Sequence, residues 1–395
     1  MNTKEKTTYM EVDLGQLKDN FRKVRSFVGK DIGIISVVKC DGYGLGLVPV
    51  SQTLYKAGSE KIGVSTSSEA VKIKKENKNI PVVTLYPPLK WEIPTLIQAN
   101  AEITVDDIKD IEAIRKISHN NKIYPPRKIH VMVDTGMNRY GIPPQEAVDF
   151  IKSATKIPQI KIEGIFSHFS TATRSDKFAV SQFAIFMEVI KRLAENGIEI
   201  PTIHIANSAA VMSFPDTINP RIFRNIMPSA RLFIRPGGIL YGLYGDLNKK
   251  TELKMNPVLR RVVSHIAHIA EIEAGEIVGY GRRWVSQEET QIATVPVGFG
   301  DDGYLIRTTE PAPLDKEPTQ VLMHGKRCKI VGLVASSGFG VDLEGIHAKK
   351  GDEVVLIGKD GNEEITLDEI TDRNSLISMQ LLTLLGARME RVYVH

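Results

Sequence analysis

Between about residues 33 and 245, short apolar runs alternate with longer amphipathic stretches. The runs are rich in isoleucine and valine, which is typical of strands covered on both faces. The stretches between them, such as 145–155 and 180–195, repeat apolar residues with helical spacing. Eight βα units over this length favour a closed (β/α)8 barrel of the TIM type over an open sheet. The predicted strands are 34–39, 62–65, 82–85, 102–105, 129–134, 160–166, 202–205 and 232–235.

After residue 245 the pattern changes to short β-like runs separated by turn residues, at 261–272, 291–297, 329–333, 352–357 and 392–394. This pattern predicts a separate, mostly antiparallel β domain. We place the barrel domain at 1–248 and the C-terminal β domain at 249–395. Residues 1–15 are expected to form an extended arm, with a helix capped by Asp13 after it. The sequence does not indicate which strand pairs with this arm.

The composition of the 395 residues is that of an ordinary globular protein, with 42% hydrophobic and 25% charged residues. No apolar stretch reaches the length needed to cross a bilayer, so no membrane partner is expected. The first residues mix charges and lack the apolar core of a secretory signal, so we expect a cytoplasmic protein. A net charge of +4 without a basic run gives no indication of nucleic acid. The two cysteines, Cys40 and Cys328, have no spacing suited to a metal site or a disulfide framework.

Lys39 ends the apolar run 34–38 and is followed by a turn that contains Gly42 and Gly44. Two interpretations fit this pattern. A lysine at the end of a buried strand can extend its ammonium group to water. A desolvated lysine instead loses part of its preference for the charged form, and its free amine can then attack an aldehyde. This segment alone leaves both interpretations open.

Residues suited to chemistry follow several of the predicted strands. In a parallel barrel the carboxyl ends of the strands form one rim, where active sites gather. Any one of these residues could be an ordinary loop residue, but the whole set favours a site at this rim. The set comprises Lys39, Asp134 with Arg139, His168, His204 with Asn207 and Ser208, and Arg235 with Gly237 and Gly238.

Two of these segments suggest an anion site. The segment 207–210 offers a hydroxyl group and amides at an expected helix start. The segment 235–238 contains two glycines, where bare backbone amides can approach a phosphate. Neither a P-loop nor a dinucleotide-binding glycine pattern is present. A barrel with a strand-end lysine and a small phosphate site points to pyridoxal phosphate.

Six motifs occur in the order found in one family of pyridoxal-phosphate enzymes. On these motifs the chain resembles the alanine racemase family, of fold type III, over nearly its whole length. The motifs are Val38-Lys39-Cys40-Asp41-Gly42-Tyr43-Gly44, Val133-Asp134-Thr135-Gly136-Met137-Asn138-Arg139, Ser167-His168-Phe169, Ala206-Asn207-Ser208-Ala209, Arg235-Pro236-Gly237 with Leu240-Tyr241-Gly242, and Gly275-Glu276-Ile277-Val278-Gly279-Tyr280-Gly281.

The resemblance implies catalytic roles. Lys39 would carry the cofactor covalently and act as one acid–base group. The other would be Tyr280 of the partner subunit, in a head-to-tail homodimer with shared sites. Racemisation needs a proton removed from one face of the substrate's α carbon and delivered to the other, which two groups can do. His168 would contact that tyrosine, and Arg235, with His204 behind it, would face the pyridine nitrogen.

The resemblance also implies the binding residues. Arg139 and the backbone amide of Ser336 would bind the carboxylate of an amino-acid substrate. Taken alone, Tyr43 and Tyr241 would be interpreted as barrel packing. The resulting prediction is an enzyme that interconverts L- and D-alanine and needs no metal. Its cofactor-binding set would be Lys39, Tyr43, His168, Asn207, Ser208, Arg235, Gly237, Gly238 and Tyr241.

Several positions depart from the family pattern. Met132 stands where alanine racemases commonly carry a carbamylated lysine that steadies the site arginine. The acidic residue of the substrate entrance is replaced by Ser337, and gate tyrosines are replaced by Phe299 and by the segment 378–380. These losses motivate the hypothesis that side chains larger than a methyl group are accepted. Alanine stays the expected substrate.

Three other classes of protein remain open. A noncatalytic pyridoxal-phosphate carrier has a similar barrel but no second domain and no equivalent of Tyr280. A fold-type III decarboxylase would need a characteristic cysteine-containing segment, whereas Cys328 lies at the start of an ordinary strand. The main alternative is a racemase of a larger or basic amino acid, such as serine, ornithine or lysine, or one of broad specificity. One methylene group is worth only about 1–3 kcal/mol of discrimination, so the sequence does not rank these substrates.

Overall fold

The computed structural model describes residues 6–120, 125–172, 176–244, 252–302, 319–374 and 376–395. The chain divides into two compact units. The barrel unit comprises Leu17–Gly42 and Leu47–Asn256, and the β unit comprises Met1–Gln16, Tyr43–Gly46 and Pro257–His395. The domain boundary expected between residues 248 and 249 lies outside the described residues.

The barrel unit contains an eight-stranded parallel sheet in the order β4-β3-β2-β9-β8-β7-β6-β5. The two end strands of this order are also linked, because Thr84 N donates to Glu102 O at 3.0 Å and Glu102 N donates to Val82 O at 2.8 Å. The sheet is therefore nearly closed, and the predicted (β/α)8 fold is confirmed. The strands are β2 (Gly33–Val37), β3 (Lys61–Val64), β4 (Val82–Thr84), β5 (Ile103–Val105), β6 (Arg127–Met132), β7 (Ile160–Phe166), β8 (Thr202–Asn207) and β9 (Arg231–Arg235).

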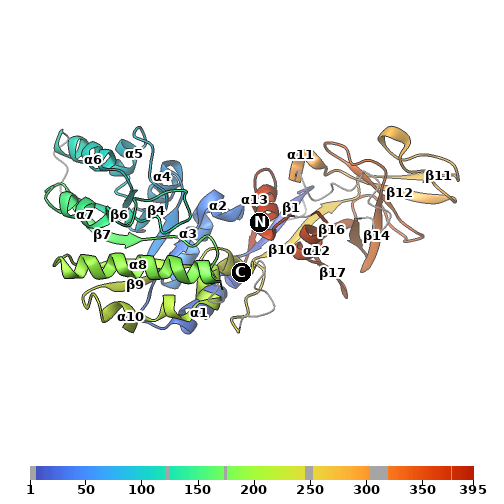
Figure 1. Ribbon diagram of the computed structural model, residues 1–395. Helices are drawn as coiled ribbons and strands as arrows, with labels where there is room; N and C mark the ends of the chain where they lie inside the picture. The colour runs from blue at the N-terminus through green and yellow to red at the C-terminus, as the bar shows by residue number, and fades with distance from the viewer. Residues whose placement is uncertain (1–5, 121–124, 173–175, 245–251, 303–318, 375) are drawn as a thin grey trace. The chain divides into compact units, whose positions relative to one another are not determined.

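Helices follow these strands and lie on the outside of the sheet, as α4 to α8 show in Figure 1. Their inward faces are apolar, as in α8, where Phe186, Ile190 and Leu193 are buried. None of the described helices is long and apolar enough to span a membrane. The helices are α1 (Leu14–Val28), α3 (Leu47–Ala57), α4 (Ser67–Glu76), α5 (Ile93–Gln98), α6 (Ile108–Asn120), α7 (Ala147–Thr155), α8 (Lys177–Glu195), α9 (Ser208–Ser213) and α10 (Pro220–Arg224).

The β unit is built on a ten-stranded sheet in the order β11-β12-β15-β14-β13-β16-β10-β1-β18, with β17 paired to β16. Among the described pairings only that of β1 with β18 is parallel, so the predicted, mostly antiparallel domain is confirmed. The run predicted at 261–272 is two strands, because the chain turns between His265 and His268. The strands are β1 (Tyr9–Asp13), β10 (Leu259–His265), β11 (His268–Ile272), β12 (Thr290–Val295), β13 (Gln320–Met323), β14 (Lys326–Val331), β15 (Phe339–Asp342), β16 (Glu353–Asp360), β17 (Glu363–Ile365) and β18 (Glu390–Val394).

The N-terminal strand β1 is an integral strand of this second sheet. It pairs antiparallel with β10, where Tyr9 lies opposite Val263, and parallel with β18. Tyr9, Val263 and Val392 form a buried cluster. Asp13 Oδ1 accepts a hydrogen bond from Gln16 N at 2.7 Å, so the predicted helix cap is confirmed. Three short helices complete the β unit: α11 (Phe299–Asp302), α12 (Leu367–Asn374) and α13 (Ser378–Leu385).

Gly164 in β7 leaves room for the ring of His130 in the neighbouring strand β6. A Cβ atom at Gly164 would lie 2.3 Å from His130 Nδ1, much closer than nonbonded atoms approach. The His130 side chain is fully buried, so its ring cannot withdraw to solvent. Only glycine therefore fits at this position without a shift of the neighbouring strand.

We expect Gly164→Ala to lower the free energy of unfolding by about 1–3 kcal/mol, as other overpacked cores do. Thermal unfolding followed by circular dichroism would measure the loss. Gly338→Ala is the matched control, because a Cβ atom there would make an ordinary contact 3.5 Å from Val295 O. Equal unfolding temperatures for the two variants would contradict the close packing of Gly164 against His130.

Candidate active site

Lys39 lies just beyond the end of β2 and begins the short helical turn α2 (Lys39–Tyr43). The predicted strand 34–39 is therefore too long at its carboxyl end. Cys40, Asp41 and Gly42 adopt left-handed φ angles of 57°, 56° and 67°. This conformation costs a non-glycine residue roughly 1–2 kcal/mol, and Asp41 offsets part of it by accepting a hydrogen bond from Leu47 N at 2.9 Å. The turn holds Lys39 at the rim of the barrel unit.

Lys39 and Arg139 contact the same side chain, Tyr86. Lys39 Nζ donates to Tyr86 Oη at 3.0 Å, and Arg139 Cζ lies 5.2 Å from the centre of the Tyr86 ring. Tyr140 adds a second ring, whose centre lies 5.2 Å from that of Tyr86 and 5.7 Å from Arg139 Cζ. Tyr86 was not predicted as a site residue, although it follows the end of β4 closely. The rule that strand ends carry the site residues could have found it.

Met132 ends β6 and is 2% exposed. Its thioether supplies no charge that could hold Arg139. The Arg139 side chain forms no ion pair with any residue that the structure describes, and its guanidinium lies instead over the two tyrosine rings. Cation–π contacts of this kind are worth about 0.5–1 kcal/mol at exposed sites. Among the described residues, two aromatic faces and no anion thus lie beside Arg139.

Arg235 ends β9, and its side chain is 3% exposed. Nη1 donates to His204 Nδ1 at 2.8 Å and to His204 O at 2.9 Å. Nη2 donates to Ser167 O at 2.7 Å, to Ile205 O at 3.2 Å and to His168 Nδ1 at 3.2 Å. Burial lowers the pKa of Arg235 to about 9, so it stays a cation at neutral pH. No hydrogen bond to the described residues uses its Nε.

The two histidines beside Arg235 are neutral. Burial, together with the charges of Arg235, Arg139 and Lys39, lowers the pKa of His168 to about 3. Burial and the charge of Arg235 hold the pKa of His204 well below its ordinary value. A guanidinium can only donate, so both histidines accept at Nδ1 and carry their proton at Nε2.

The contact predicted between His204 and Arg235 is present, and the hydrogen bonds continue into the barrel. His204 Nε2 lies 3.0 Å from His130 Nδ1, and His130 Nε2 lies 2.8 Å from Glu102 Oε2. Glu102 also accepts from Lys61 Nζ at 2.5 Å. Glu102, His130 and Lys61 were not predicted from the sequence, because isolated polar residues within or next to strands carry no signal of a partner on another strand.

Ser208 and Gly237 come together beyond β8 and β9. Gly237 N donates to Ser208 Oγ at 2.9 Å. Asn207 caps α9, since its Oδ1 accepts from Ala210 N at 3.0 Å. Gly238 begins the 3₁₀ turn η3 (Gly238–Tyr241). The predicted phosphate-binding segments are therefore neighbours in space.

The two tyrosines predicted to bind the cofactor are buried. The Tyr241 hydroxyl donates to Val37 O at 3.0 Å. Tyr43 ends the left-handed turn, with a φ angle of 53°, and is 4% exposed. Contact with a cofactor stays a prediction for both of them.

Tyr280 and Ser336 belong to the β unit. Tyr280 begins the 3₁₀ turn η5 (Tyr280–Arg282) and is 73% exposed. Gly300 N donates to Ser336 O at 2.9 Å, so the segment of Ser336 lies against the turn that carries Phe299. Phe299 is exposed.

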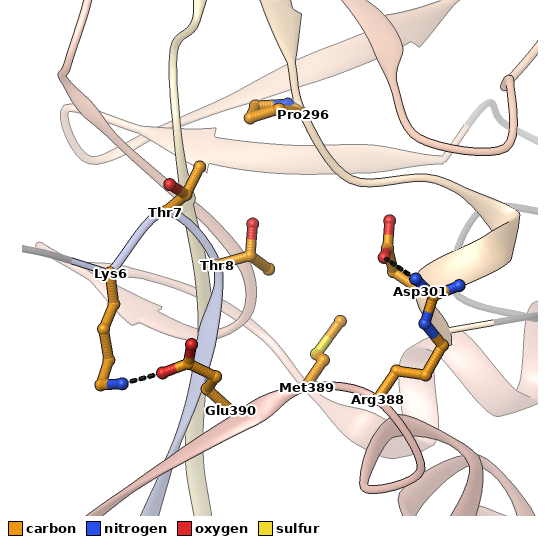
Figure 2. A pocket seen from close by; sticks show the side chains of 8 residues that line it. All are labelled: Lys6, Thr7, Thr8, Pro296, Asp301, Arg388, Met389 and Glu390. Atoms are coloured by element: carbon orange, nitrogen blue, oxygen red, sulfur yellow. Dashed lines mark ion pairs between the residues drawn. The ribbon is translucent and has the colours of Figure 1, made fainter.

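A recess with a volume of about 320 Å³ lies in the β unit, next to that turn, and Figure 2 shows the side chains that line it. Arg388 is paired with Asp301 at 3.7 Å, and Lys6 is paired with Glu390. The four charged groups thus pair with one another and direct no net charge toward a ligand. The recess is lined by Lys6, Thr7, Thr8, Pro296, Asp301, Arg388, Met389 and Glu390.

Comparison with known families identifies both parts of the chain. The family model of the alanine racemase N-terminal domain matches residues 12–245, and that of the C-terminal domain matches residues 259–393. The chain belongs to the alanine racemase family. The predicted family is thereby confirmed, and with it the predicted class of enzyme, an isomerase of the alanine racemase type.

Members of the alanine racemase family resemble the chain along nearly its whole length. It is 30% identical over 394 residues to the alanine racemase of Methanococcus maripaludis, with 98% of each chain covered. It is 33% identical over 394 residues to that of Clostridium novyi, with 98% of this chain and 95% of the relative covered. The crystal structure of alanine racemase from Bacillus anthracis with bound L-Ala-P is 27% identical and superimposes with a TM-score of 0.86, over 99% of this chain and 95% of that one.

The neutral state of His168 makes stability depend on pH. In the unfolded chain a histidine takes up a proton near pH 6.5, whereas the folded protein resists this until about pH 3. The contribution of His168 to stability is therefore present above pH 6.5 and is lost as the pH falls toward 3. The loss is at most about 1.4 kcal/mol per pH unit.

We expect His168→Gln to reduce the fall in unfolding free energy between pH 6.5 and 5 by up to about 2 kcal/mol. Urea unfolding at several pH values would measure this slope. His119→Gln, at an exposed position near the end of α6, is the control and should keep the slope of the wild type. A His168→Gln protein with an unchanged slope would show that His168 takes up protons in the folded state.

Proposed function

We propose that the protein is a pyridoxal-phosphate-dependent amino-acid racemase that interconverts L- and D-alanine. Its relatives, similar over 98% of this chain, are named alanine racemases, which supports this reaction. The observation that carries the proposal is the buried guanidinium of Arg235, whose Nε has no hydrogen-bond partner among the described residues. That N–H is left for a ligand, and the pyridine nitrogen of pyridoxal phosphate is an acceptor that fits it.

The other side chains at the rim also fit this cofactor. The Lys39 amine donates to the hydroxyl of Tyr86, forms no ion pair with the described residues and can bind an aldehyde. The Ser208 hydroxyl and the backbone at Gly237 and Gly238 would bind the phosphate, with Tyr43, Asn207 and Tyr241 completing the set. When bound, pyridoxal phosphate withdraws electrons from the substrate's α carbon and makes its proton acidic.

Two groups would exchange the proton at the α carbon. Lys39 Nζ serves one face, and the hydroxyl of the partner subunit's Tyr280 serves the other, in a homodimer with shared sites. A tyrosine has an ordinary pKa of about 10 and needs a neighbour that favours its ionised form. His168 suits this task, because it accepts from Arg235 at Nδ1 and keeps a proton at Nε2 for the tyrosine oxygen. As His168 is neutral, it helps by its hydrogen bond and not by charge.

Arg235 would direct the reaction toward proton exchange. With a pKa of about 9 it is protonated at neutral pH. A guanidinium donates a hydrogen bond and keeps its proton. Arg235 therefore limits the electron withdrawal by the ring, which favours racemisation over side reactions.

Arg139 would bind the substrate carboxylate, together with the backbone amide of Ser336. Tyr86 and Tyr140 hold Arg139 through ring faces at 5.2 and 5.7 Å and leave its positive charge unneutralised. A guanidinium matches a carboxylate with two parallel hydrogen bonds. Arg139 would thus be available to this ligand without a competing anion from the described chain.

The second candidate function is racemisation of a larger or basic amino acid, such as serine, ornithine or lysine, or of a broad set. Phe299 and Ser337 favour it, because they replace a gate tyrosine and an acidic residue and leave an entrance with fewer polar groups. Phe299 is 56% exposed, so its ring does not fill the interior of the β unit.

We expect the protein with pyridoxal phosphate to racemise alanine faster than serine, ornithine, lysine or arginine. Polarimetry or chiral chromatography over this panel would rank the substrates. Lys39→Ala is the blank, which should lose both activity and the absorbance of covalently bound cofactor. No racemisation of any amino acid, or a Lys39→Ala protein that keeps this absorbance, would contradict the proposal. A faster rate with a larger amino acid would favour the second candidate.

We expect Tyr280→Phe to slow racemisation by about 10²–10⁴-fold, as the loss of a general acid–base group does. Exchange of the α proton with deuterium should then persist for one enantiomer only. A mixed dimer of Lys39→Ala and Tyr280→Phe subunits should recover activity, because it contains one site with both groups intact if the site is shared between subunits. If activity is not recovered at any mixing ratio, Lys39 and Tyr280 act within one subunit.

A further inference from the structure

Four buried side chains form a continuous hydrogen-bonded path through the interior of the barrel unit. Glu102 precedes β5, His130 lies in β6, His204 lies in β8 and Arg235 ends β9. The three links are 2.8 Å between Glu102 Oε2 and His130 Nε2, 3.0 Å between His130 Nδ1 and His204 Nε2, and 2.8 Å between His204 Nδ1 and Arg235 Nη1. Both histidines are fully buried, and Glu102 is 6% exposed.

Only one arrangement of protons satisfies all three links. Glu102 is ionised, since His130 and Lys61 hold the pKa of its carboxyl group well below the ordinary value despite burial, and it can only accept. His130 therefore donates from Nε2. At the other end Arg235 can only donate, so His204 accepts at Nδ1 and donates from Nε2 to His130 Nδ1. Every donor along the path points from Arg235 toward Glu102.

We infer that Glu102 is a positioning residue for Arg235, acting through His130 and His204. This inference rests on the proposed function, in which Arg235 Nε faces the cofactor. The carboxylate and the guanidinium, at opposite ends of the path, favour the same tautomer of both histidines, and in that tautomer His204 Nδ1 is the acceptor for Nη1 of Arg235. With both Nη atoms committed to protein acceptors, Nε is the donor that stays available.

The packing around the path leaves its rings no alternative position. Phe166 stacks on His204, with ring centres 4.6 Å apart and an angle of 9° between the planes. Gly164 has no side chain and gives the His130 ring its place, as a Cβ atom there would lie 2.3 Å from Nδ1. A change of tautomer therefore breaks a hydrogen bond and cannot be absorbed by rotation of a ring.

Glu102 also belongs to a cluster of charges, which supplies a matched control. Lys61 Nζ lies 2.5 Å from Glu102 and 3.4 Å from Glu163, and Lys128 Nζ lies 3.4 Å from Glu102 and 3.5 Å from Glu163. Glu163 thus shares both lysines with Glu102, but its side chain has no hydrogen bond to His130 among the described contacts. Glu163→Gln removes a comparable charge and leaves the path intact.

The test compares the wild-type full chain with Glu102→Gln, Glu102→Asp and Glu163→Gln, by ¹⁵N NMR of the histidine rings, with and without pyridoxal phosphate. A glutamine amide can either accept from or donate to His130 Nε2, whereas the carboxylate can only accept, so Glu102→Gln no longer holds the proton at Nε2. We expect Nε2–H tautomers for His130 and His204 in the wild type, Glu102→Asp and Glu163→Gln, and an Nδ1–H form of at least one of them in Glu102→Gln. His130→Asn and His204→Asn spectra assign the signals.

A second measurement follows the consequence at Arg235. We expect Glu102→Gln to weaken pyridoxal-phosphate binding about tenfold or more, the worth of one hydrogen bond to a charged group, while Glu163→Gln binds like the wild type. Equilibrium dialysis with the cofactor alone measures this without any turnover. The kcat of Glu102→Gln should fall by about ten- to a hundredfold, as expected for a misplaced catalytic group, with a smaller change in KM.

The wild-type spectrum alone can overturn the inference, even if Glu102→Gln does not fold. An Nδ1–H form of either histidine in the wild type, or equal spectra and equal cofactor affinity of Glu102→Gln and Glu163→Gln, would exclude a positioning role for Glu102. These readouts require no racemisation. The tautomers and affinities could instead be as expected in a protein that racemises no amino acid. That result would overturn the proposed function and leave the role of Glu102 at Arg235 in place.

Discussion

The burial of one cation, the guanidinium of Arg235, is the constraint on which the candidate site depends. Burying such a group is costly unless its N–H groups find acceptors. The barrel supplies these acceptors from backbone carbonyls at the ends of two strands. Ser167 O lies just beyond β7, and His204 O and Ile205 O lie where the register between β8 and β9 shifts. A continuous parallel sheet would use these carbonyls in its own ladder. The irregular end of β8 is therefore what allows Arg235 to lie inside the rim.

The same cation determines the ionisation of its neighbours. A positive charge at Arg235, added to burial, keeps His168 and His204 neutral, so each ring has one donor and one acceptor. Because Arg235 occupies the acceptor of both rings, their Nε2–H groups point away from it in two directions. On the His204 side the donors run to Glu102, deep in the barrel. On the other side, His168 Nε2–H would donate to the tyrosine oxygen of the proposed reaction. The single charge of Arg235 thus determines the direction of the hydrogen bonds on both of its sides.

Much of the fold could be predicted from the sequence, because it depends on local patterns. The strand Ile160–Phe166 has the predicted bounds, and the alternation of apolar runs with amphipathic stretches was enough for the barrel. The partners of β1 and the contact of Tyr86 with Lys39 and Arg139 could not be predicted, since they join segments distant in sequence. The left-handed turn after β2 was missed for another reason: Cys40 and Asp41 adopt a conformation that their residue types disfavour, and the surrounding contacts override that preference.

The two arginines at the rim of the barrel are held by different interactions, Arg235 by hydrogen bonds and Arg139 by aromatic rings, which suits them to different roles. Arg235 is fixed by five hydrogen bonds and has one orientation, as a partner of a bound ring requires. Arg139 is exposed and lies over the faces of Tyr86 and Tyr140, which attract a cation without prescribing the direction of its N–H groups. In the proposed site, with no anionic partner among the described residues, Arg139 would follow a bound carboxylate through small changes of position. Under the proposed function, this aromatic support would let Arg139 bind carboxylates in more than one position, which is the property that the hypothesis of substrates larger than alanine requires.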